Sequence, residues 1–337
     1  MRQPIAGFRA HMRARRRFAA AAALAWCLYA TANAHAASTS PAPTCELEPG
    51  PSRTVTRVID GETVALDDGR EMRLAGILSP RARDAGATPG GWPLEEAAKI
   101  ALADLVLGKQ VQIAFGAERS DRYGRVVGHL FITTGGLRQW IEGELLGRGL
   151  ARASVLPGDG ACIAELLAHE RLARIDVSGV WRLRLYAVKP AHQVGALSAA
   201  RSSFQIVRGR VLNVGRTKSA VYLNFGKDWR TDFTVRVPRS VLREDEAWAQ
   251  SLDTLKEREV EVRGWIERRN GPMISIAHRG ELVIPGENED LPEPSISQRA
   301  PMKDSDAPAP ATAQGSDSPT PKKNRPERQR TPGDLDL

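Results

Sequence analysis

Three short clusters of the sequence bring acidic, arginine and glycine residues together. Asp60 and Glu62 flank a glycine in the first cluster, Arg73 begins the second, and the third runs from Asp121 to Arg125. Carboxylates are ligands for hard divalent cations, and guanidinium groups bind phosphate oxygens through paired hydrogen bonds. An isolated Asp-Gly marks only a turn, whereas the three clusters together form a more specific pattern.

The sequence around these clusters alternates apolar and polar residues over short stretches. Strands are predicted over residues 53–59, 63–66, 71–78, 110–115 and 125–133, and Asp60-Gly61 and Asp67-Asp68-Gly69 are the turns between the first three. Helical spacing of apolar residues predicts helices over residues 94–107, 139–146 and 161–175. This order suits a five-stranded oligonucleotide/oligosaccharide-binding (OB) barrel with three helices, an α+β fold that is mainly β.

In this order, the clusters resemble the staphylococcal-nuclease-like (thermonuclease) family over residues 54–181. The resemblance rests on Val58-Ile59-Asp60-Gly61-Glu62-Thr63, on Arg73-Leu74-Ala75-Gly76-Ile77-Leu78-Ser79-Pro80 and on Asp121-Arg122-Tyr123-Gly124-Arg125. It implies a hydrolase that cleaves phosphodiester bonds of DNA and RNA with one calcium ion and a glutamate as base. Arg73 and Arg125 then match the two catalytic arginines, and Asp60 and Glu62 match acidic residues of the metal site.

The second cluster departs from the family pattern. Where the family has an aspartate ligand and, three positions later, the glutamate base, this chain has Leu78 and Arg81. Leucine offers no oxygen ligand, and a guanidinium group stays protonated and cannot act as a base. Losing a general base costs roughly 10²–10⁴-fold in rate. We therefore expect at most a weak calcium site, unless Asp84 substitutes through a shifted loop, and leave open whether the chain is an enzyme.

Arginines are numerous around the matched positions. They include Arg81, Arg83, Arg119 and Arg122. We expect Arg81, Arg122 and Tyr123 to bind the substrate. The expected partner is a nucleic acid, DNA or RNA. For Arg83, Arg119 and Arg122, surface solubility with ordinary ion pairs is an alternative. Two functions follow from the resemblance: phosphodiester hydrolysis by a degenerate site, or non-catalytic binding of nucleic acid or another polyanion on a nuclease scaffold.

The positive charge is concentrated at the start of the chain. The 337 residues contain 48 Lys and Arg against 40 Asp and Glu, a formal net charge of +8. Residues 1–36 contain no acidic residue and six arginines, all of them before residue 18. An apolar run over residues 18–30 comes next, and Ala34-His35-Ala36 ends the segment. This pattern predicts a signal peptide cleaved near Ala36 and export to the periplasm or the medium, with no membrane association afterwards. An uncleaved amphipathic anchor is the alternative, since the run is too short to span a bilayer.

Composition divides the rest of the chain. The content of 42% hydrophobic and 26% charged residues excludes a wholly disordered chain and a polytopic membrane protein. The predicted parts are an N-terminal segment (37–52), the thermonuclease-like domain (53–188), a linker (189–203), a second small OB-like β domain (204–285) and a disordered tail (286–337). In the second domain, strands are predicted over 205–213, 220–225, 232–237, 258–266 and 272–276, with a helix over 238–249.

Cys45 and Cys162 are the two cysteines that remain after the signal peptide. An even number of cysteines in an exported chain predicts a disulfide between them. Two unpaired thiols are the alternative, because the sequence does not show whether the sulfur atoms are close.

The second domain contains a segment rich in aromatic residues. Tyr222, Phe225, Trp229 and Phe233 could form a base-stacking platform edged by Arg216, Lys218, Lys227 and Arg230. Aromatic residues at alternate positions of a strand are more often core, and this second interpretation is the one we prefer.

Overall fold

The computed structural model describes residues 45–81, 93–155, 160 and 162–285. The predicted signal peptide and C-terminal tail, together with Arg83 and Asp84, lie outside these residues. The described residues belong to one compact unit. Among them, no helix has the length and apolar composition needed to cross a membrane.

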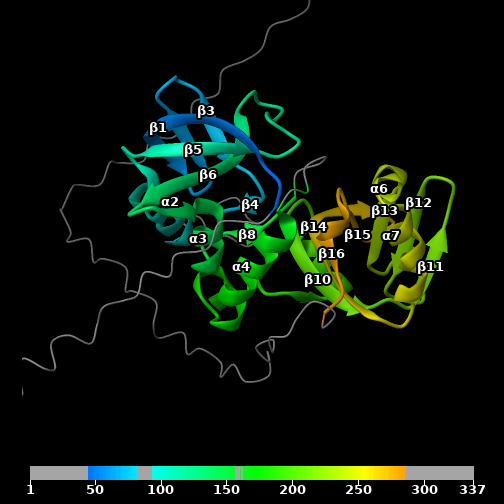
Figure 1. Ribbon diagram of the computed structural model, residues 1–337. Helices are drawn as coiled ribbons and strands as arrows, with labels where there is room; N and C mark the ends of the chain where they lie inside the picture. The colour runs from blue at the N-terminus through cyan, green and yellow to red at the C-terminus, as the bar shows by residue number, and fades with distance from the viewer. Residues whose placement is uncertain (1–44, 82–92, 156–159, 161, 286–337) are drawn as a thin grey trace, which may run out of the picture. The chain divides into compact units, whose positions relative to one another are not determined.

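Five strands of the first half close into a barrel (Figure 1). They are β1 (Glu48–Asp60), β2 (Thr63–Leu66), β3 (Glu71–Leu74), β5 (Gln110–Phe115) and β6 (Val126–Thr134). Neighbouring strands pair in the order β3-β2-β1-β5-β6, and a parallel pairing of β3 with β6 closes the cylinder. Two short strands, β4 (Ile77–Leu78) and β8 (Arg152–Ala153), pair with each other, and β7 (Leu137–Trp140) extends the sheet beside β6. The barrel confirms the predicted fold class.

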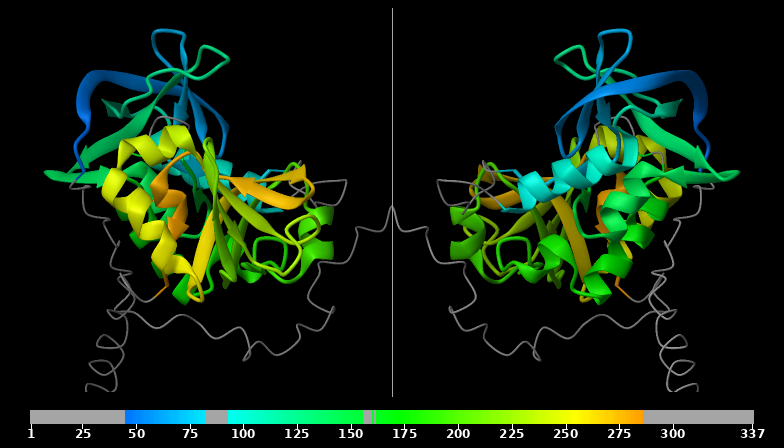
Figure 2. Two further views of the ribbon diagram at one scale, coloured as in Figure 1. Left: turned by 90° about the vertical axis from the view of Figure 1, so that its right-hand side faces the viewer. Right: turned by 90° about the vertical axis from the view of Figure 1, so that its left-hand side faces the viewer.

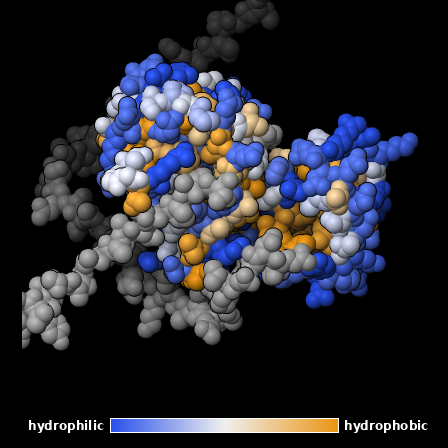
Figure 3. All heavy atoms as spheres, in the orientation of Figure 1, coloured by the Kyte–Doolittle hydropathy of each residue, from blue (hydrophilic) through white to orange (hydrophobic). Residues whose placement is uncertain are grey.

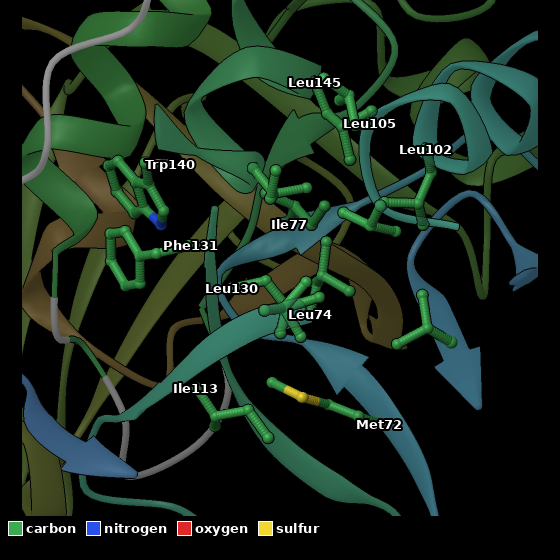
Figure 4. Packing of buried hydrophobic residues seen from close by; sticks show 14 of the residues in the cluster. Met72, Leu74, Ile77, Leu102, Leu105, Ile113, Leu130, Phe131, Trp140 and Leu145 are labelled. Atoms are coloured by element: carbon green, nitrogen blue, oxygen red, sulfur yellow. The ribbon is translucent and has the colours of Figure 1, made fainter. Parts of the chain in front are cut away.

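Three helices accompany the barrel: α2 (Pro93–Val106), α3 (Ile141–Gly147) and α4 (Ile163–Ile175), followed by the 3-10 turn η1 (Gly179–Arg182). Helix α3 packs against both α2 and α4, as the views of Figure 2 show. Leu102 and Leu105 of α2 and Leu145 of α3 share one buried cluster with strand residues such as Met72 and Leu130 (Figure 4). Burial of these apolar faces, at about 25 cal/mol per Å², is the main force that holds the helices to the barrel.

The second β domain is a further sheet with short helices. Its main path runs β11 (Asn213–Arg216), β12 (Ala220–Asn224), β13 (Thr234–Pro238), β15 (Gly271–Ser275), β14 (Glu259–Arg269), β10 (Phe204–Arg210) and β9 (Lys189–Pro190), and β16 (Leu282–Val283) pairs with β14. The helical elements are α5 (Val194–Ala199), α6 (Arg239–Glu244), α7 (Glu246–Ser251), η2 (Leu252–Leu255) and η3 (Arg279–Glu281). Hydrophilic residues cover most of the surface drawn over β11, β12 and α6 in Figure 3.

Two stretches of this region differ from the sequence-based expectation. Residues 189–203, expected as a linker, contain β9 and α5. The single helix expected over 238–249 is two helices, because Asp245 takes an extended conformation (φ −151°) and its side chain accepts a hydrogen bond from the Trp248 N–H as the N-cap of α7.

A buried network of charged side chains connects α4 to strands β10 and β14. Arg263, whose side chain is 1% exposed, lies 3.0 Å from a Glu170 carboxylate oxygen and 3.4 Å from Glu261. Arg174 and Arg208 also pair with Glu261, at 2.8 and 2.7 Å. Burial acts to raise the pKa of Glu261, but the arginines outweigh it and lower the pKa to about 2.

Cys45 and Cys162 form a disulfide, which confirms the predicted pair. The bond ties the start of the described chain to the N-terminus of α4, across a sequence separation of 117 residues. Disulfides stabilise proteins mainly by restricting the unfolded chain, typically by about 2–4 kcal/mol for long loops.

Replacing both cysteines, Cys45→Ala and Cys162→Ala, is expected to lower the free energy of unfolding by about 2–4 kcal/mol because the unfolded chain regains that freedom. Urea denaturation of the oxidised protein and of the double variant measures the difference. A reductant should bring the unmodified protein close to the variant and leave the variant unchanged. Equal stabilities before reduction would contradict the prediction.

Candidate functional site

The turn between β1 and β2 places Glu62 in a buried position beside the segment that follows β4. A Cβ at Gly61 would lie 2.8 Å from the Ala98 Cβ and 2.9 Å from the Ser79 Cβ, so only glycine fits without displacing these neighbours. Asp60 stabilises the turn, since its Oδ1 accepts a hydrogen bond from the Glu62 N–H at 2.9 Å. The Glu62 carboxylate is completely buried as a result.

Three groups surround the Glu62 carboxylate. The Ser79 N–H donates a hydrogen bond to Oε2 at 2.7 Å. On the other oxygen, Oε1, Arg81 donates a hydrogen bond through Nη2, and the Arg73 Nε lies 3.2 Å away. A buried carboxylate needs such partners, because leaving it unpaired would cost several kcal/mol. Glu62 therefore serves as the common counter-ion of Arg73 and Arg81.

The closing contact of the barrel brings Arg73 and Arg125 together. In the parallel pairing of β3 with β6, Arg73 is the partner of Val127, two residues after Arg125. Burial lowers the pKa of Arg73, and the positive charge of Arg125 lowers it further. Arg125 donates from Nε to Asp121 at 2.8 Å and from Nη1 to the Thr63 hydroxyl at 3.4 Å.

The third cluster is a turn held by Asp121. Its Oδ1 accepts hydrogen bonds from the Tyr123 N–H (2.9 Å) and the Arg125 N–H (3.1 Å), and Gly124 supplies the positive φ of 79° that the turn needs. Burial acts to raise the pKa of Asp121, but its bonds with Arg125 and with the backbone lower it overall.

Tyr123 is the aromatic residue of this turn and is 68% exposed. The guanidinium carbons of Arg122 and Arg125 lie 4.8 and 5.5 Å from its ring centroid, and Arg122 also donates to the Tyr123 hydroxyl oxygen at 2.6 Å. Such contacts hold long arginine side chains in place at the surface. The structure thus groups Arg122, Tyr123 and Arg125 in one turn.

Arg119 differs from the other arginines of the region. It pairs with Glu48 and lies over the Phe115 ring at 5.1 Å from the centroid. This arrangement is the ordinary surface ion pair that the sequence left as an alternative for Arg119.

A family model described as staphylococcal nuclease homologue matches residues 71–183. These residues belong to the staphylococcal nuclease family. The match contains Arg73, Leu78, Arg81 and Arg125, whereas Asp60 and Glu62 lie outside it, before its first residue. No curated protein matches the chain. The matched range therefore includes the two arginines of the resemblance and the two positions, Leu78 and Arg81, at which the sequence departs from it.

Calcium is the metal that the nuclease family implies, and the described residues of this nuclease-like domain do not fit it. Leu78 is 3% exposed and lies in an apolar cluster with Trp181, Tyr186 and Phe204. Glu62 is paired with two arginines, and no group of three or more His, Cys, Asp or Glu side chains among the described residues could hold a metal ion. Calcium requires six or more oxygen ligands, several of them from carboxylates. Arg81 instead supplies the positive charge beside Glu62.

The sequence had not indicated two of the contacts that build this site, those of Ser79 and Thr63. The backbone N–H of Ser79 and the hydroxyl of Thr63 are ordinary groups, and only their positions next to Glu62 and Arg125 give them a role. A signal was available for Ser79, because it follows the strand that carries Leu78 and precedes a proline that fixes the turn.

Proposed function

We propose that the nuclease-like domain binds the phosphodiester backbone of a nucleic acid and does not hydrolyse it with calcium. The observation that carries this proposal is the ion pair of Arg81 with the completely buried Glu62. Arg81 stands at the position of the catalytic base that the family resemblance implies, and a guanidinium group cannot accept a proton. Glu62, whose oxygens already accept from Ser79 and Arg81, is not available to activate water.

The arginines supply the binding chemistry. Arg73 is 16% exposed and Arg125 24%, so both side chains are partly desolvated and their interaction with a phosphate is less screened than at an open surface. Arg122 and Tyr123, in the turn beside Arg125, provide a further cation and an exposed ring against which a nucleotide could pack.

The cellular location is part of the same proposal. The Cys45–Cys162 disulfide supports export to the periplasm or the medium, since such bonds persist in oxidising compartments. Nucleic acid bound by this protein would then be extracytoplasmic.

Fluorescence anisotropy with a labelled single-stranded DNA tests the proposal on the chain that lacks residues 1–36. We expect salt-sensitive binding that is equal in calcium and in EDTA, and an intact DNA after incubation. Arg125→Ala is expected to weaken binding about 10- to 100-fold, because it removes charge-assisted hydrogen bonds to phosphate. Arg57→Ala, at an exposed position of β1, removes the same charge and should leave affinity nearly unchanged.

Calcium-stimulated cleavage that disappears in Arg125→Ala would contradict the proposal and support hydrolysis by the degenerate site. Equal affinity of the unmodified protein, Arg125→Ala and Arg57→Ala would contradict the assignment of the binding site.

A further inference from the structure

A cavity of about 630 Å³ lies in the second β domain, at the end of the β14–β15 hairpin. One wall is the hairpin itself, with Ile266, Glu267, Arg268, Asn270, Gly271 and Pro272. Arg230 and Thr231 of the loop between β12 and β13 form the second wall, and Ser198 and Arg201, in and just after α5, form the third. The volume is within the range of small-ligand sites in proteins.

The charge of the cavity is positive. Arg201, Arg230 and Arg268 line it, and Glu267 is the single acidic residue among the lining side chains. Within the described part of the chain, none of the three arginines forms an ion pair, in contrast to Arg216, which pairs with Asp253 at 2.9 Å, and to Arg279, which pairs with Asp245. Converging cations without counter-ions concentrate anions in a concave site.

The loop that carries Arg230 is held in a defined position. Asp228 accepts hydrogen bonds from the Arg230 N–H at 3.0 Å through its side chain and from the Thr231 N–H at 3.0 Å through its carbonyl. The loop also touches the hairpin closely, because a Cβ at Gly271 would lie 2.4 Å from the Thr231 carbonyl oxygen. Because the backbone of the loop and of the hairpin is already held in place, the binding of a ligand requires little further ordering of these two walls.

An exposed tryptophan stands next to the cavity. Of the aromatic residues expected to form either a stacking platform or core, Phe225 and Phe233 are buried and pack on each other, with ring centroids 5.1 Å apart. Trp229, however, is 51% exposed, and the Arg230 guanidinium carbon lies 4.7 Å from its ring centroid. An exposed indole beside an arginine-lined cavity is the combination that binds a base and its phosphate in single-stranded nucleic acids.

We propose that this cavity is a second nucleic-acid site, in which Arg201, Arg230 and Arg268 hold phosphate groups of a single strand and Trp229 stacks on a base. The site shares no residue with Arg73, Arg81 and Arg125, so it does not depend on the function proposed for the nuclease-like domain.

The test measures anisotropy of a labelled single-stranded oligothymidylate on the chain without residues 1–36. Arg230→Ala with Arg268→Ala is expected to weaken binding at least 10-fold and to reduce the slope of log K against log salt by about 1.4 for two lost phosphate contacts. Trp229→Ala is expected to weaken binding about 5- to 100-fold through lost stacking. The matched control is Arg210→Ala with Arg243→Ala, which removes two exposed arginines of the same domain and should change affinity less than twofold.

The same variants in the Arg125→Ala background separate the two sites. If the cavity binds the oligonucleotide, Arg230→Ala with Arg268→Ala also lowers the affinity in the Arg125→Ala background. This holds whether or not Arg125→Ala alone changes the affinity. An unchanged affinity of the Arg230 and Arg268 double variant would overturn the proposal. An equal loss of affinity in the Arg210 and Arg243 control would also overturn it. An unchanged affinity of Trp229→Ala, together with complete competition by inorganic phosphate, would indicate a simple anion pocket and overturn it as well.

Discussion

Replacing Leu78 with aspartate is expected to lower the free energy of unfolding by about 4 kcal/mol or more and to create no calcium site. Leu78 is 3% exposed, and it lies in a buried apolar cluster with Trp181, Tyr186 and Phe204. The substitution loses the transfer free energy of a buried leucine and adds a polar group with no partner in an apolar cluster. Glu62, another carboxylate that the resemblance assigns to the metal site, is already paired with Arg73 and Arg81 and would not be free to bind calcium.

Urea denaturation of the unmodified protein, Leu78→Asp and Leu78→Met measures this effect. Methionine keeps the apolar volume and should cost less than about 1.5 kcal/mol. A calcium-dependent increase in the melting temperature of Leu78→Asp would show that the carboxylate had completed a metal site, contrary to the expectation. A loss no greater than that of Leu78→Met would show that position 78 is not core.

The second large effect is expected at Arg263. Arg263→Met should lower the free energy of unfolding by about 3–5 kcal/mol, because it leaves Glu170 and Glu261 buried with one partner fewer. The Ala153 carbonyl, which accepts a hydrogen bond from Arg263 at 3.0 Å, also loses a donor. Arg268→Met is the matched control on the same strand, since Arg268 is exposed and should change stability by less than about 0.5 kcal/mol. Equal stabilities of the two variants would contradict a role for the buried network.

Acid titration gives a second measure of the same network. The folded-state pKa of Glu261 is about 2, below its ordinary value of 4.5, so its charge stabilises the fold above pH 4.5. That stabilisation is lost as the pH falls from 4.5 towards 2, because protons then bind the unfolded state first. The stability difference between the unmodified protein and Arg263→Met should therefore narrow over this range.

The sequence predicted the barrel where local signals and tertiary pairing agree. Strands 63–66 and 110–115 were predicted with the bounds of β2 and β5, since alternation and flanking turns define them locally. Residues 139–146 were predicted as helix, but α3 begins only at Ile141, because residues 137–140 pair with β6 as β7. A pairing partner on another strand outweighed helical spacing at that end.

The second β domain shows the same limit. The aromatic pattern correctly indicated core at Phe225 and Phe233, which directly follow β12 and precede β13, but it extended to Trp229, which lies in the middle of the loop between these strands and is exposed. An alternating pattern predicts burial in a strand and at its ends, and does not predict it in the loop beyond.

The amino-acid sequence was sufficient to show what the side chains at positions 78 and 81 cannot do. Residue type alone excludes an oxygen ligand at Leu78 and a base at Arg81, because those properties belong to the side chains themselves. Only the tertiary structure decided that Glu62 is a counter-ion of Arg73 and Arg81 and that Leu78 belongs to the core. Both facts depend on groups that the fold brings together, by closure of the barrel and by packing with residues as remote in sequence as Phe204. Electrostatic pairing and burial are set by distances in space and not by sequence separation.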